Sequence, residues 1–182
     1  MPCPCSPSPP PLPLLVLPPT HNLQGENARM SSFIGAIAIA DRRVERGRMS
    51  SDEAAAVVVG ITAMNGIADI GGVDAVIEAV PEDLALKIRV HAEIDAAVRP
   101  GALVATNTSG LSVTALADAT TDPGRLIGLH FFNPASTMRL IEVIAGAATD
   151  ATTIARACAL ARALGKEPVR VAECPGFVVN RV

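Results

Sequence analysis

A histidine and a glutamate lie within two apolar runs that only a short connection separates. The first run, Leu126 to Phe132, contains His130, and the second, Leu140 to Ile144, contains Glu142. Each run is short and bounded by Gly, Pro or Asn, which is the pattern of a buried strand. A parallel pair would need a crossover of about a dozen residues, so we expect an antiparallel hairpin. With the pairing centred on Ser136, His130 lies directly opposite Glu142, with about 5 Å between their Cβ atoms.

Such a pair can perform general base catalysis. A neutral imidazole takes a proton from a substrate hydroxyl at one nitrogen, while the carboxylate holds the N–H at the other and stabilises the imidazolium that forms. Two other interpretations stay open. His130 could be a core histidine whose hydrogen bond is satisfied by a nearby acid. A pairing shifted by one residue would place the two side chains on opposite faces of the hairpin.

Strands that alternate with helices before the hairpin predict an α/β fold with a mostly parallel sheet. Val73 to Val80 and Ala102 to Thr106 have the pattern of buried strands. In such a sheet the ligand crevice lies outside the carboxyl ends of the parallel strands. Convergent polar groups on an apolar scaffold are the usual form of a ligand site. The predicted strand ends bring these polar side chains to one edge: Glu82, Asn107, Ser109, His130 and Asn133.

Helix signals fill the intervals between the predicted strands. Helical periodicity runs from Ser31 to about Arg46, with Gly47 as a C-cap. A capping box at Ser50 to Glu53 opens a second helix to about Val58, and a short strand is expected near Val59 to Ala63. The later expected elements are a helix after Pro81 with the apolar stripe Leu86, Val90, Ile94 and Val98, a short helix capped by Ser112, a helix from Asp150 to Leu164 capped by Gly165, a strand from Pro168 to Val171, and a helix start at Pro175 to Arg181.

The composition excludes several classes of function. The chain has 182 residues, of which 49% are apolar, so it can bury a core. A net charge of -3 and an aromatic content of four Phe, with no Trp or Tyr, argue against a nucleic-acid partner. No apolar run approaches the roughly 18 residues of a membrane span. The four cysteines have neither a disulfide pattern nor zinc-ligand spacing, so we expect no metal site and a cytoplasmic protein with reduced thiols.

The N-terminus differs from the rest of the chain. Residues 1–19 hold nine of the fifteen prolines and are expected to form neither a helix nor a central strand. No basic residue precedes Leu12 to Leu17, so a secretory signal is not expected. We therefore divide the chain into a Pro-rich disordered tail, residues 1–30, and a folded domain, residues 31–182.

Five motifs occur in one order from about Gly47 to the C-terminus: Val76–Leu84, Asn107–Ser109, His130–Pro134, Leu140–Ile144 and Pro175–Arg181. Together they resemble the NAD-binding domain of the L-3-hydroxyacyl-CoA dehydrogenases, and the Pro-Glu-Asp-Leu variant resembles the 3-hydroxybutyryl-CoA dehydrogenases. The resemblance implies a Rossmann-like, doubly wound sheet and a reversible, NAD-dependent oxidation of a 3-hydroxyacyl-CoA to the 3-ketoacyl-CoA. It also implies a homodimer.

The resemblance also implies roles for individual residues. His130 would be the base that takes the 3-hydroxyl proton, and Glu142 would orient it. Ser109 and Asn180 would hydrogen-bond the reacting oxygen or the imidazole. The nicotinamide and ribose side of the cofactor site would be lined by Ala79, Glu82, Lys87, Asn107 and Asn133.

Simpler interpretations of several of these residues are available from the sequence. Ser109 could cap a turn, and Asn180 could be an N-cap. Lys87 lies four residues after Asp83 and could form a surface ion pair with it. The two remaining histidines, His91 and His21, we assign to solvent.

The sequence departs from the family at both ends. A domain of this kind should open with a strand and a G-x-G-x-x-G turn that binds the pyrophosphate, but the sequence contains no such motif. We expect the first βαβ unit to be replaced by the Pro-rich tail, and the helical domain that completes the acyl-CoA site and forms the dimer to be missing after Val182. Two hypotheses follow: an enzyme with its catalytic residues in place, or a non-catalytic remnant that binds NAD weakly or not at all.

Overall fold

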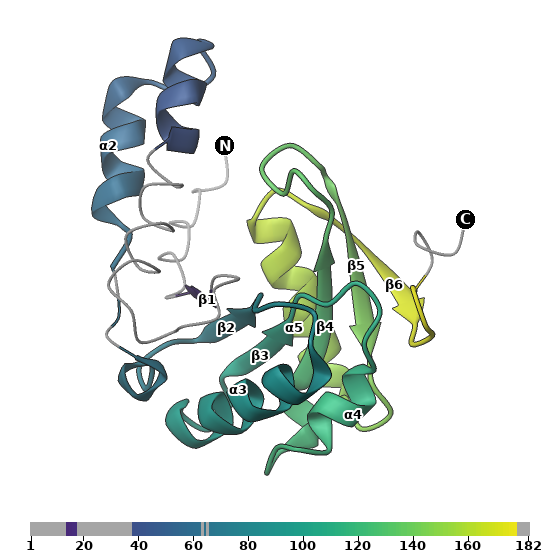
Figure 1. The fold of residues 1–182 in the computed structure, drawn as a ribbon. Coiled ribbons are helices and arrows are strands. Elements are labelled where there is room, and N and C mark those ends of the chain that lie inside the picture. Colours follow the sequence, from purple (N-terminus) through teal and green to yellow (C-terminus); the bar gives the residue numbers. More distant parts are fainter. Residues whose placement is uncertain (1–13, 18–37, 63, 65, 178–182) are drawn as a thin grey trace, which may run out of the picture.

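A six-stranded sheet forms the centre of the fold in the computed structural model, which describes residues 14–17, 38–62, 64 and 66–177 (Figure 1). The strands lie in chain order across the sheet, and every neighbouring pair is parallel except the β4–β5 hairpin. The strands are β1 (Leu14–Leu17), β2 (Ala75–Glu78), β3 (Leu103–Thr106), β4 (Leu126–Phe131), β5 (Leu140–Ala145) and β6 (Glu167–Ala172). The predicted α/β class, mostly parallel with an antiparallel hairpin, is confirmed.

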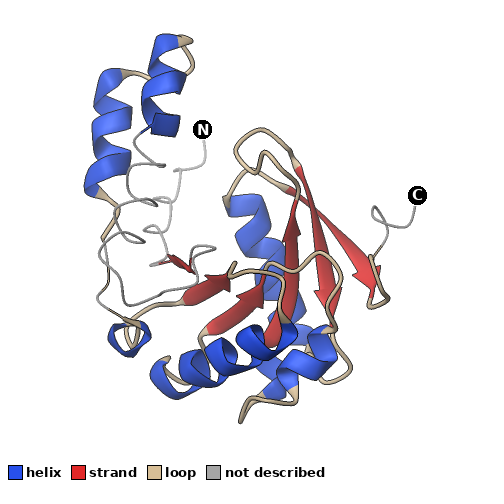
Figure 2. Cartoon of the chain, viewed as in Figure 1, coloured by secondary structure: helices blue, strands red, loops and turns tan. Residues whose placement is uncertain are grey.

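Helices cover both faces of this sheet (Figure 2). On one face, α3 (Leu84–Ala97) and α4 (Val113–Ala117) pack against side chains such as Val76 and Val104. On the other face, α5 (Ala151–Ala163) covers a second apolar cluster that includes Ile77 and Leu129. Neighbouring residues of β2 alternate between the two clusters because successive side chains of a strand point to opposite faces. Both faces of the central strands are therefore buried, as a parallel sheet requires.

The N-terminal helices have the caps that the sequence predicts. A helix over residues 38–45 is followed by Gly47 with φ +63°, a backbone conformation that favours glycine. The beginning of this predicted helix lies outside the described residues. In α2 (Ser51–Val59), the Ser50 hydroxyl accepts a hydrogen bond from the Glu53 N–H, and the Glu53 carboxylate accepts one from the Ser50 N–H. This reciprocal pair is the expected capping box.

Two predictions for the N-terminal half were wrong. No strand occupies residues 59–62: Val59 is the last residue of α2, Gly60 caps the helix, and Ala63 lies outside the described residues. The second wrong prediction is disorder at Leu14–Leu17: these four residues of the Pro-rich tail form β1, which pairs in parallel with β2. β1 lies at the edge of the sheet, and edge positions tolerate flanking prolines because one side of the strand needs no ladder hydrogen bonds. The remainder of the tail and the boundary at residue 30 lie outside the described residues.

The later helices are also capped. The Ser112 side chain accepts a backbone N–H at the start of α4, as predicted, and Asp83 and Asp150, which had not been predicted as caps, do the same for α3 and α5. Gly165 follows α5 with φ +72°, as expected for a C-terminal cap. One assignment on α3 was wrong: His91, which we had placed in solvent, is fully buried. Its helix buries Lys87, Val90, His91 and Ile94, so the inward stripe contains two polar residues as well as the expected apolar ones.

Candidate active site

The hairpin places His130 directly opposite Glu142, in the register centred on Ser136. Nδ1 of His130 lies 2.7 Å from Oε2 of Glu142, a hydrogen-bond distance. Both residues are buried, with 8% and 2% of their surface exposed. The register shifted by one residue is therefore excluded. With Nδ1 held by the carboxylate, Nε2 is the ring nitrogen left to exchange a proton with a ligand.

Two phenylalanines pack around the imidazole of His130. The ring centroids of Phe132 and Phe177 lie 4.7 Å and 5.8 Å from that of the imidazole. Phe177 is itself buried and comes from the segment after β6. This apolar surrounding lowers the local dielectric and strengthens the interaction between His130 and Glu142. We had not predicted a role for either ring, although Phe132 lies two residues after the histidine in the strand pattern.

Glu82 fixes the loop that follows β3. Its Oε1 accepts hydrogen bonds from the Thr108 hydroxyl at 2.6 Å and from Ser109 N–H at 2.8 Å. Ser109 Oγ and Gly110 N–H donate to the same oxygen at 3.0 Å and 3.2 Å. Partial burial raises the pKa of the Glu82 carboxyl, but these hydrogen bonds outweigh it and hold the pKa below its ordinary value. Glu82 and Ser109, predicted at one edge of the sheet, are therefore in contact there, and buried Thr108, which we had not predicted, joins them.

Asn107 connects the end of β3 to β4. Its Oδ1 accepts a hydrogen bond from the N–H of Phe131 at 3.0 Å, next to His130 in the chain. The amide nitrogen of Asn107 has no hydrogen-bond partner among the described residues. Asn133 is exposed beyond the end of β4, and its peptide bond to Pro134 is cis. The structure thus brings the strand-end residues to one edge, and Asn107 presents an uncommitted donor there.

Lys87 is the residue whose surroundings differ most from expectation. It is fully buried, and its Nζ donates to Glu78 Oε1 at 2.7 Å and to the Val80 carbonyl at 3.0 Å. A surface pair with Asp83 is therefore wrong, because the Asp83 side chain instead caps α3 through Leu86 N–H. Glu78 was not among the residues predicted from the sequence. An acid inside an otherwise apolar strand was the signal that could have identified it.

The structure joins four of the predicted site residues into two pairs. His130 and Glu142 form the hydrogen-bonded pair, and Glu82 and Ser109 are joined through the loop after β3. Ala79 is partly exposed at the end of β2, as is Asn107 at the end of β3. Asn180 lies outside the described residues, so its predicted role remains a prediction.

These residues fit one half of a dinucleotide. The edge offers the Glu82 carboxylate, 39% exposed at its side chain, and the Asn107 amide donor, which are suited to ribose hydroxyl and carboxamide groups. For the other half, the sequence has no G-x-G-x-x-G turn, and the segment that follows β1 lies outside the described residues. The described residues therefore bear only on the side of the site predicted to border the nicotinamide and ribose, and that role remains a prediction.

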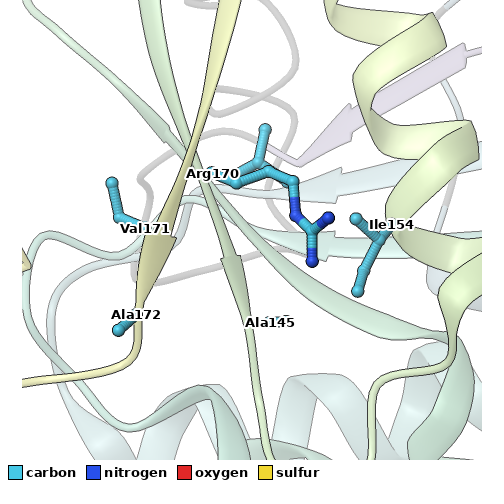
Figure 3. Close-up of a pocket in the computed structure, with 6 residues that line it drawn as sticks. Ala145, Ile154, Arg170, Val171 and Ala172 are labelled. Carbon is cyan, nitrogen blue, oxygen red and sulfur yellow. The ribbon is translucent and has the colours of Figure 1, made fainter.

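A cavity of about 430 Å³ lies elsewhere on the molecule (Figure 3). In this view the guanidinium of Arg170 extends from β6 toward Ile154 of α5. The cavity contains neither His130 nor Glu142, so it is separate from the candidate active site. Its lining residues are Val143, Ala145, Ile154, Arg170, Val171 and Ala172.

Two searches of the described residues were negative. They contain no group of three or more His, Cys, Asp or Glu side chains that could hold a metal ion. None of the helices in the described part of the chain is long and apolar enough to cross a membrane.

Comparison with known proteins extends these findings. Residues 22–174 match the model of the 3-hydroxyacyl-CoA dehydrogenase, NAD binding domain. The fatty acid oxidation complex subunit alpha of Pseudomonas paraeruginosa is 44% identical over 147 residues, which cover 81% of this chain and 21% of that protein. The 3-hydroxyadipyl-CoA dehydrogenase of Escherichia coli is 37% identical over 163 residues, 90% of this chain and 32% of that protein.

A solved structure agrees with the sequence comparisons. The (S)-3-hydroxybutyryl-CoA dehydrogenase of Ralstonia eutropha superposes with a TM-score of 0.85 at 36% identity. The match covers 87% of this chain and 56% of the other. The chain therefore spans between a fifth and a third of the length of these two curated relatives and about half of the solved one.

Proposed function

Because the chain belongs to the 3-hydroxyacyl-CoA dehydrogenase family, through the NAD-binding domain of that family, we propose that it interconverts 3-hydroxyacyl-CoA and 3-ketoacyl-CoA with NAD. The observation that carries the proposal is the buried His130–Glu142 pair at 2.7 Å, opposite each other on β4 and β5. A carboxylate that holds one imidazole nitrogen leaves the other to act as a base, which is what oxidation of a secondary alcohol needs.

In the proposed mechanism Nε2 of His130 takes the proton of the substrate 3-hydroxyl. The positive charge that develops on the ring is stabilised by Glu142 through Nδ1–H. NAD, when bound, supplies the acceptor for the hydride that leaves carbon 3. In the reverse direction the imidazolium returns the proton to the oxygen of the 3-ketone.

The remaining residues are proposed to position the reactants. Ser109 and Asn180 would hydrogen-bond the reacting oxygen or the imidazole. Ala79, Glu82, Asn107 and Asn133 would border the nicotinamide and ribose. Lys87, which is buried, would act through its neighbours. We also propose that the substrate is an acyl-CoA and that the protein is a cytoplasmic homodimer.

The proposal is tested by NADH binding and acetoacetyl-CoA-dependent NADH oxidation with the purified 182-residue chain. The chain has no Trp or Tyr, so NADH fluorescence is measured with little protein background. We expect saturable NADH binding, and turnover that falls by about 10²- to 10⁴-fold in His130→Gln while NADH binding persists.

A matched control for that variant is Arg99→Met, a substitution in the ion pair with Asp74, which lies before β2, next to the amino end of that strand. This variant should keep wild-type turnover. Turnover that survives His130→Gln would refute the assignment of the base. Absence of both NADH binding and turnover in the wild-type chain would instead favour the non-catalytic remnant, which the missing G-x-G-x-x-G turn also suggests.

A further inference from the structure

A second group of polar side chains is buried beside the candidate active site, and the proposed chemistry does not use it. Glu78, Lys87, His91 and Thr106 are all 0% exposed. Oε1 of Glu78 accepts from Lys87 Nζ at 2.7 Å, and Oε2 accepts from Thr106 Oγ1 at 2.8 Å. His91 Nε2 lies 3.1 Å from the same Oε2. We call Glu78, Lys87 and His91 the buried triad.

The buried triad hydrogen-bonds the main chain at the end of β2. Glu78 Oε1 also accepts the N–H of Val80 at 2.5 Å, and Lys87 Nζ donates to the carbonyl of Val80 at 3.0 Å. The N–H and the carbonyl of Val80 are therefore both hydrogen-bonded by the Glu78–Lys87 ion pair. Val80 begins the short segment that leads to Glu82, and Lys87 Nζ lies 3.9 Å from Glu82 Oε2. Glu82 in turn binds Ser109.

Stability alone is a weak explanation of such a group. A buried ion pair recovers little more than its desolvation cost, and well-packed apolar side chains can often replace it without loss. Here the other buried residues of α3, Val90 and Ile94, are apolar and belong to the core on this face of the sheet. His91 Nδ1 is moreover buried with no hydrogen-bond partner among the described residues, a further cost.

We infer that Glu78, Lys87 and His91 are positioning residues that hold the segment from Ala79 to Glu82 in the shape that borders the cofactor. His91 and Thr106 fix one oxygen of the Glu78 carboxylate, so the other oxygen and Lys87 Nζ meet Val80 in one geometry. In this arrangement Lys87 acts on the segment through the carbonyl of Val80. The inference rests on the proposed function because it names NAD as the cofactor. The hydrogen bonds to Val80 do not depend on that function.

Two variants separate positioning from stability. Lys87→Met leaves the Glu78 carboxylate buried without its cation and is expected to lower stability strongly. The double variant Glu78→Gln/Lys87→Met removes both charges with little change in side-chain volume and is expected to regain most of that loss. It still lacks the hydrogen bond from Nζ to the Val80 carbonyl. Arg99→Met, in the exposed ion pair with Asp74, is the matched control.

Three quantities are measured on each full-length protein: the urea unfolding midpoint, the Kd for NADH, and hydrogen exchange of the amides of residues 79–83. In the double variant we expect about tenfold weaker NADH binding, the factor for one hydrogen bond from a charged donor. The amides of residues 79–83 should exchange about tenfold faster for the same reason, while those of β3 and β4 keep wild-type rates. Arg99→Met should change none of these.

The NADH affinity and the hydrogen exchange together distinguish failure of the inference from failure of the proposed function. A double variant with wild-type NADH affinity and wild-type exchange at residues 79–83 would overturn the inference, and so would exchange that accelerates equally throughout the sheet. If the wild-type chain does not bind NADH, the proposed function fails, and the exchange data still decide whether the buried triad holds this segment.

Discussion

Replacement of Glu142 by Gln tests the pairing of β4 and β5 as a functional arrangement. The variant removes a charge and little volume, and the new amide oxygen can still accept the hydrogen bond from His130 Nδ1–H. What is lost is the charge assistance of a 2.7 Å contact between two buried groups. Hydrogen bonds to charged groups exceed neutral ones by about 1 to 2 kcal/mol. Since the imidazole is charged in the transition state, this corresponds to a loss of about 5- to 30-fold in kcat.

A larger loss has a defined structural cause. If the new amide turns its NH2 group toward Nδ1, the imidazole must carry its proton on Nε2 and cannot act as the base. The loss then approaches the 10²- to 10⁴-fold contribution of a general base. In either orientation the KM for acetoacetyl-CoA should change little, because Glu142 lies behind the ring and is 2% exposed.

The assay is steady-state NADH oxidation with acetoacetyl-CoA, together with the urea midpoint of each protein. Glu167→Gln is the matched control, since Glu167 pairs with Arg139 where both side chains are exposed. That variant should keep wild-type kcat. A Glu142→Gln protein that is folded and within twofold of wild-type kcat would refute the assignment of Glu142 as the orienting group.

Three further predictions concern stability, each measured by urea unfolding. Gly128→Ala should lower the free energy of unfolding by about 1 to 3 kcal/mol, because the new Cβ would lie 3.0 Å from Ile144 Cβ, whereas Gly72→Ala, where nothing lies within 4 Å, should cause no loss. Ser50→Ala removes the cap of α2 and should cost about 1 kcal/mol. Stability should also fall in acid. Burial raises the pKa of Glu78, but its hydrogen bonds with His91 and Lys87 lower this pKa by more, so the pKa in the folded protein is below the ordinary value of 4.5. Ionised Glu78 therefore stabilises the fold fully above pH 4.5, and this stabilisation is lost as the pH falls through the pKa of the folded protein. The double variant Glu78→Gln/Lys87→Met should show a shallower loss of stability as the pH falls below 4.5.

The sequence was sufficient where a local pattern and a geometric rule agree. The register of His130 and Glu142 follows from two apolar runs and the length of their connection, and the caps at Ser50 and Ser112 follow from residue type and spacing. The strand expected near Val59 failed because a β-branched run was given more weight than the capped helix α2, which includes Val59 and ends at Gly60. β1 was missed because the flanking prolines obscured four residues that an edge position accepts.

The buried triad shows why part of the site was out of reach. An apolar stripe predicts which face of α3 is buried, but it says nothing of polar residues on that face. Lys87 and His91, four residues apart, share it. Their burial is explained only by Glu78 on β2, since a buried carboxylate requires a cation and hydrogen-bond donors. That requirement links β2 to α3 through the fold and is not visible in either segment alone.

The hydrogen bonds at this edge of the sheet also limit what a ligand can meet there. Both oxygens of Glu78 and Oε1 of Glu82 accept hydrogen bonds from protein donors, and Oε2 of Glu142 lies 2.7 Å from Nδ1 of His130. Among the described residues, Nε2 of His130 and the amide nitrogen of Asn107 have no hydrogen-bond partner. One is a proton acceptor and the other a donor, and their residues are neighbours at the ends of β3 and β4, because Asn107 Oδ1 accepts the N–H of Phe131, the residue after His130. An acceptor for a hydroxyl proton beside a donor for a carbonyl oxygen is the pair that a hydroxyacyl substrate and a carboxamide-bearing cofactor need together.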